Sequence, residues 1–135
     1  MVLSSGIHTP AKRKTRVERV NRCAARMVSN DYGRHSSVTS MLTRLGWATL
    51  EQRRENQRLT MMYKVVHGLV AVPTTHLTAA DSRTRANHSF KFRSISCNSM
   101  PYKFSFFPQT IPSWNLLPAE SAEVASVDAF KHRLS

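Results

Sequence analysis

The stretch TLEQRRENQRLTMMYKVVHGL, residues 49–69, carries the start, the apolar stripe and the end of one long helix. Thr49 and Gln52 form a capping box, in which each side chain reaches the backbone N–H of the other residue. Apolar side chains then recur at helical spacing: Leu59, Met62, Tyr63 and Val66, widened by Met61, Val65 and Leu69. Gly68 suits the left-handed residue that follows a helix. The pattern predicts a helix from Leu50 to about His67.

Two shorter helices are expected before this stretch, after a disordered lead over residues 1–13. The first runs from about Lys14 to Asn30 and carries one apolar stripe: Val17, Val20, Ala24, Met27 and Val28. Ser36 or Ser37 caps the second, whose apolar residues are Val38, Met41, Leu42 and Leu45, and Gly46 ends it. We therefore predict a basic helical subdomain over residues 14–72.

The composition changes after residue 72. Phe90–Arg93 and Tyr102–Phe106 alternate apolar and polar side chains, the period of a strand, and Ser94–Pro101 would join them as a hairpin. Ser126 caps a last short helix with Val127, Phe130 and Leu134 on its inner face. The predicted fold is mostly α with a small β-hairpin. Residues 73–135 supply a loop, short strands and a terminal helix, packed on the helical subdomain.

The charge is the most unusual feature of the composition. The chain holds 20 Lys and Arg against 8 Asp and Glu, a formal net charge of +12. Such an excess favours a polyanion such as RNA or DNA, or an anionic membrane surface, although basic composition also serves solubility. The residues that we expect to contact phosphates lie on the first and third helices: Arg16, Arg19, Arg22, Arg26, Arg53, Arg54 and Arg58.

Aromatic and basic side chains are interleaved between residues 90 and 107. Bases of single-stranded nucleic acid stack on such aromatics, which makes Phe90, Phe92 and Tyr102 candidates for stacking. The alternative is that one strand face buries its aromatics in the core. The sequence favours this alternative, because aromatic residues are scarce elsewhere in the chain.

The residues of most catalytic sites are missing. Sites for paired divalent metals need carboxylates close together, and no two acidic residues of this chain are adjacent. The four glycines are scattered and build no phosphate-binding loop. The spacing of His67, His76 and His88 does not fit zinc. We therefore expect no enzyme, no catalytic residue, no metal site, no cofactor and no small-molecule substrate.

The sequence shows no recognisable signal for export from the cell. Cys23 and Cys97 lie far apart, and no signal peptide or membrane span is recognisable. Cys23 lies among arginines, which would lower its pKa, or is an inert thiol beside the core. The expected location is intracellular, nuclear or cytoplasmic, without secretion or membrane binding. The oligomeric state stays open.

Several stretches, in order, resemble one family. Val20–Val28 resembles the "VQRRAARFV" helix found late in reverse transcriptases of non-LTR (LINE-type) retrotransposons. The resemblance continues through further segments: Tyr32, Ser36–Leu42, Leu45–Trp47, Leu50–Arg54, Arg58–Lys64, Gly68–Val70, Arg83–Ser89, Ser105–Pro108, Ile111, Trp114–Asn115, Leu117–Pro118, Ala129–Lys131 and Leu134. It covers residues 16–134, and its specificity lies in the order and spacing of the pieces. Cys23 departs from it, because the family often has Arg there.

The resemblance implies a position at the C-terminus of the polyprotein, around and beyond the thumb and downstream of the palm. In that family of RNA-directed DNA polymerases, catalysis belongs to palm aspartates and to an N-terminal endonuclease, and neither has a counterpart here. The implied function is a non-catalytic remnant of a reverse transcriptase that retains sequence-independent binding of RNA or DNA. The alternative is a structural packing fragment with no independent activity.

Overall fold

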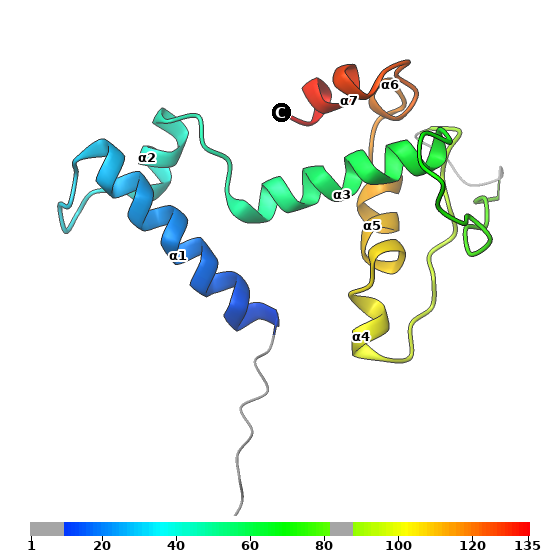
Figure 1. The fold of residues 1–135 in the computed structure, drawn as a ribbon, viewed down its shortest axis with the longest axis horizontal. Helices are drawn as coiled ribbons and strands as arrows, with labels where there is room; N and C mark the ends of the chain where they lie inside the picture. Colours follow the sequence, from blue (N-terminus) through cyan, green and yellow to red (C-terminus); the bar gives the residue numbers. More distant parts are fainter. Residues whose placement is uncertain (1–9, 82–87) are drawn as a thin grey trace, which may run out of the picture. The chain divides into compact units, whose positions relative to one another are not determined.

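A computed structural model describes residues 10–81 and 88–135, and the side chains of residues 15–81 and 88–135. Nearly all regular structure in these residues is helical (Figure 1): α1 (Pro10–Ser29), α2 (Val38–Arg44), α3 (Leu50–Val66), α4 (Met100–Lys103), α5 (Phe106–Asn115), α6 (Ala119–Ala122) and α7 (Val127–Leu134). The predicted mostly α class is confirmed. Of the expected disordered lead, residues 1–9 lie outside the described part, whereas α1 already begins at Pro10.

The chain divides into two compact units, Met1–Arg54 and Glu55–Ser135, and the division falls inside α3. It lies earlier in the chain than the boundary expected after residue 72, which stays a prediction. The first unit has a small buried core: Ala25 of α1 with Met41 and Leu42 of α2. Val38 and Leu45 pack against it.

Side-chain oxygens cap the helices where the sequence predicts. Ser37 Oγ accepts a hydrogen bond from the Ser40 N–H at 3.4 Å, and Thr49 Oγ1 accepts one from the Gln52 N–H at 3.1 Å. A third bond was not foreseen: a carboxylate oxygen of Glu18, on α1, accepts from the Leu50 N–H at 3.1 Å. Each bond satisfies an N–H that the first turn of a helix leaves without a backbone partner.

The first three helices end in the same way. Asn30, Gly46 and Gly68 have positive φ angles of 48°, 64° and 64°. After α2, the Gly46 and Trp47 N–H groups donate to the carbonyls of Thr43 and Leu42. The N–H groups that follow α1 and α3 repeat this pair of bonds. This is the Schellman motif, which ends a helix by reversing the handedness of one residue.

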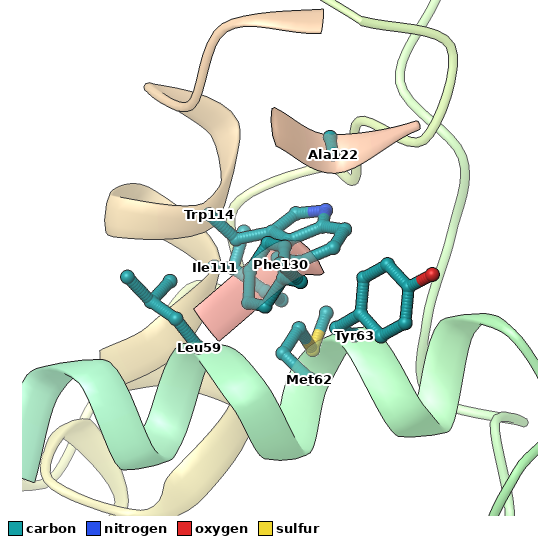
Figure 2. Packing of buried hydrophobic residues seen from close by; sticks show 7 residues of the cluster. All are labelled: Leu59, Met62, Tyr63, Ile111, Trp114, Ala122 and Phe130. Atoms are coloured by element: carbon teal, nitrogen blue, oxygen red, sulfur yellow. The ribbon is translucent and has the colours of Figure 1, made fainter. Parts of the chain in front are cut away.

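The larger core lies in the second unit (Figure 2). Four helices contribute to it: Leu59, Met62 and Tyr63 from α3, Ile111 and Trp114 from α5, Ala122 from α6 and Phe130 from α7. The Tyr63 and Phe130 rings stack with centroids 4.7 Å apart, and the Tyr63 hydroxyl donates to the Val124 carbonyl. The predicted apolar stripe of the long helix is confirmed at Leu59, Met62, Tyr63, Val65 and Val66, whereas Met61 and Leu69, which were expected to widen it, are exposed. The predicted cap of the last helix is confirmed, with Ser126 Oγ accepting from the Ala129 N–H.

The predicted β-hairpin is wrong. Tyr102 lies in α4, Phe106 begins α5 and Phe90 lies in a turn, so only Lys91–Arg93 stays extended. The partner of this extended segment is Thr78–Ala80: the Ala80 N–H donates to the Lys91 carbonyl at 2.9 Å, and the Arg93 N–H to the Thr78 carbonyl at 2.8 Å.

The other edge of the extended segment is occupied by a side chain. The Asn115 amide accepts from the Phe92 N–H at 3.1 Å and donates to the Phe92 carbonyl at 2.7 Å. One amide thus makes both bonds that a neighbouring strand would make at this residue. Because both edges are paired, no second strand is needed, and residues 100–103 are free to form a turn of helix with Pro101 in its first turn.

Candidate nucleic-acid interface

Because each residue of a helix is rotated by 100° from the one before it, the side chains of α1 are distributed over three faces. One packs on α2 through Ala25, which is fully buried, with Asn21 and Ser29 beside it. The second carries Arg19, Arg22 and Arg26. The third is the predicted apolar stripe.

The packed face is the polar one. Asn21 Nδ2 and Ser29 Oγ are buried without a hydrogen-bond partner among the described residues. The predicted stripe instead faces outward, with Val20, Met27 and Val28 exposed by 68%, 74% and 60%. Burial on α2 thus leaves both the arginine face and the apolar face of α1 accessible.

Three of the predicted arginines gather at one hollow of the first unit. Arg19 and Arg22 of α1 and Arg54 of α3 line a depression of about 530 Å³. The hydroxyl-bearing residues Thr15 and Thr49 line it as well. Guanidinium and hydroxyl groups are the usual donors to phosphate oxygens.

Two carboxylates moderate the charge of this hollow. Glu18 and Glu51 also line it, so three guanidinium groups face two carboxylates. Glu18 is bound to the Leu50 N–H, and the first turn of α3 therefore neutralises part of its charge. The local excess is one positive charge, which suits contact with a backbone phosphate more than tight capture of a free anion.

The other predicted arginines lie elsewhere. Arg16 is exposed but is not among the residues that line the hollow, and Arg53 lines a different depression. Arg58 belongs to the second unit. Arg26 is half-buried, and its Nη1 donates to the Gly33 carbonyl at 3.3 Å. Arg26 therefore holds the turn after α1, which reduces its availability to a ligand.

The turn after α1 is organised by one carboxylate. Asp31 Oδ1 accepts from Ser36 Oγ at 2.6 Å and from the Gly33 N–H at 3.0 Å. The bond from Ser36 lowers the pKa of Asp31 below its ordinary value of 3.8, and the Gly33 bond and the Arg26 charge lower it further. The ionised carboxylate thus fixes the connection between the arginine-bearing helix and α2.

The three candidate stacking residues have different surroundings. Phe90 and Phe92 pack against the core of the second unit, and the Phe90 ring lies 5.1 Å from the His67 ring. Tyr102 of α4 is 46% exposed. The packing of the two phenylalanines matches the alternative that the sequence favours, and a stacking role for Tyr102 stays a prediction.

The remaining candidate groups are also placed. Cys23 is exposed, so its predicted position beside the core is wrong: it lies on the outward side of α1. His67 and His88 bond through Nε2 to the carbonyls of Ala122 and Trp114, at 3.4 and 3.0 Å. Within residues 10–81 and 88–135, no three His, Cys, Asp or Glu side chains gather as metal ligands would. None of the described helices is both long and apolar enough to cross a bilayer.

Sequence reasoning missed four residues as parts of the hollow: Thr15, Glu18, Thr49 and Glu51. One signal was present, because Glu18 is the only acidic residue of α1. A lone carboxylate on a basic helix is expected to bind a hydrogen-bond donor or a cation. Which group it binds depends on how the chain turns between α1 and α3. Comparisons with models of protein families, with curated proteins and with solved structures found no match for this chain.

Proposed function

We propose that this chain is a non-catalytic nucleic-acid-binding module, a remnant of a non-LTR retrotransposon reverse transcriptase. The observation that carries the binding proposal is the convergence of Arg19, Arg22 and Arg54 at one hollow. The net charge of +12 supplies a longer-range attraction to any polyanion. The remnant proposal rests on the resemblance alone, and a broken polymerase reading frame directly upstream of the codon for Met1 would support it.

Backbone phosphates are the ligand that this arrangement fits. The hollow offers cations and hydroxyl groups, and such contacts position RNA or DNA without reading its sequence. If all three guanidinium groups contact phosphates, the logarithm of the binding constant falls with the logarithm of the salt concentration with a slope of about −2.7 for a duplex. Affinity then drops roughly 40-fold between about 50 and about 200 mM salt.

Fluorescence anisotropy of a labelled duplex and a labelled single strand, titrated at several salt concentrations, tests the proposal. Arg22→Ala removes one contact, so the slope should become shallower by about 0.9 on the duplex. Arg22→Lys keeps the cation and should keep the slope. Arg93→Ala is the matched control, because Arg93 is exposed in the second unit and its loss changes the net charge equally.

Two results contradict binding at the hollow. A slope near zero for the unchanged protein shows that no counterions are released. Equal losses for Arg22→Ala and Arg93→Ala show that only the overall charge matters.

A second candidate is a structural packing fragment without activity of its own, and one observation favours it. The apolar face of α1 is exposed, while the core of the first unit contains only a few buried side chains. Such a fragment aggregates and unfolds with poor cooperativity. A sharp, concentration-independent melt followed by circular dichroism would contradict this candidate.

A further inference from the structure

A second depression of the first unit is apolar where the first is charged. It has a volume of about 580 Å³ and is lined on one side by Val17, Val20 and Ala24 of α1, and on the other by Trp47 and Leu50. We call these five residues the apolar groove. Three of its side chains are partly open to solvent: Val17 by 45%, Val20 by 68% and Trp47 by 38%.

The apolar face of α1 extends past the groove. Val28 is 60% exposed and lies on the same face as Val17, Val20 and Ala24 by helical spacing. From Val17 to Val28 the helix rises about 16 Å, or three turns. A face of this length matches the apolar side of one partner helix, whose anchors recur every three or four residues.

The charge around the apolar groove indicates which kind of partner can bind there. Among the residues whose side chains the structure describes, Arg53 is the only ionisable one that lines this depression, and none that line it are acidic. The chain as a whole has a net charge of +12. A second copy would bring like charges together at the groove, whereas a helix with acidic flanks would pair them.

We propose that the apolar groove docks an amphipathic helix of an acidic partner protein, with apolar anchors between Val20 and Trp47 and a carboxylate on Arg53. This goes beyond nucleic-acid binding, because it uses a different face of α1. It also gives the exposed valines a role that contact with phosphates does not.

The test uses the full chain and a designed helical peptide of about 18 residues, long enough to span the face. The peptide carries Leu at every third or fourth position and Glu on both flanks, and its control carries Lys in place of Glu. Trp47 reports binding, because the other tryptophan, Trp114, is fully buried. We expect the Glu peptide to shift the tryptophan emission to the blue and the Lys peptide to leave it unchanged.

Three variants locate the site. Val20→Asp places a charge in the groove and should weaken binding of the Glu peptide at least tenfold. Val72→Asp is the matched control, because Val72 is also exposed but lies in the second unit. Arg53→Glu should reverse the preference toward the Lys peptide.

Several outcomes would overturn the proposal. Equal binding of both peptides, or equal loss from Val20→Asp and Val72→Asp, shows that the contact is not at the groove. A dimer in sedimentation equilibrium that Val20→Asp abolishes assigns the face to a second copy. A blue shift of Trp47 with phosphatidylserine vesicles or RNA, but with neither peptide, assigns it to those ligands. Val20→Asp should leave the salt slope for nucleic acid unchanged, and Arg22→Ala should leave peptide binding unchanged, so each proposal can fail alone.

Discussion

Replacing Asn115 by alanine removes both hydrogen bonds that hold Phe92, the N–H at 3.1 Å and the carbonyl at 2.7 Å. A lost bond costs about 0.5–1.5 kcal/mol where water replaces the partner and about 1–3 kcal/mol where it does not. Phe92 is half-buried, so water reaches the segment in part. We therefore expect Asn115→Ala to lower the free energy of unfolding by about 2–3 kcal/mol.

Urea unfolding followed by circular dichroism measures this loss, with thermal melts as a second reading. For a unit of this size each kcal/mol shifts Tm by roughly 4–8 °C, so a fall of roughly 10–20 °C is expected. Asn98→Ala is the control, because Asn98 is exposed and its loss should stay within about 0.5 kcal/mol.

Asn115→Asp sharpens the test. The aspartate keeps the acceptor for the Phe92 N–H but turns its second oxygen toward the Phe92 carbonyl, which raises its pKa in the folded state. A raised folded pKa contributes stability below the unfolded value of about 3.9, and this contribution is lost as the pH rises through the folded pKa. Relative to the unchanged protein at each pH, the aspartate variant should have a lower free energy of unfolding at neutral pH and regain part of it in acid. The reasoning is refuted if Asn115→Ala and Asn98→Ala are equally stable, or if the aspartate variant shows no recovery.

The other predictions concern Trp114, Asp31 and Gly68. Trp114→Phe removes the indole N–H that donates to the Phe90 carbonyl at 2.8 Å. The unpaired carbonyl should lower the free energy of unfolding, measured in urea, by about 1–3 kcal/mol. An unchanged free energy would mean that water reaches this carbonyl. Asp31 has a lowered pKa when folded, so it stabilises the fold above its ordinary value of 3.8 and loses this effect as the pH falls through the folded pKa. Melts from about pH 6 to about pH 2.5 should therefore show a gap between the unchanged protein and Asp31→Asn that narrows in acid, and a constant gap would contradict this. Gly68→Ala meets open space but a φ of 64°, so thermal melts should show a loss of about 1 kcal/mol from the backbone alone, and a loss above about 3 kcal/mol would point to a clash.

What the sequence determined by itself is the local structure of the helices. The capping serines and Thr49 lie next to the N–H groups that they bind, and Gly46 and Gly68 take φ angles that other residues avoid. These interactions span only a few residues, so their pattern can be read directly from the chain. The apolar stripe of α3 could be read in the same way, because one buried face repeats at the period of the helix.

Tertiary structure alone decided the rest. Alternation in Phe90–Arg93 indicates an extended segment but does not name its partner, and the partner turned out to be Thr78–Ala80 together with the side chain of Asn115. The stripe of α1 shows where apolar side chains lie but not whether anything covers them. In this fold α2 packs against Ala25, on another face, and the valines remain open. The same holds for the arginines, because only the path of the chain from α1 to α3 brings Arg54 to Arg19 and Arg22 and bonds the Arg26 side chain to the turn after α1.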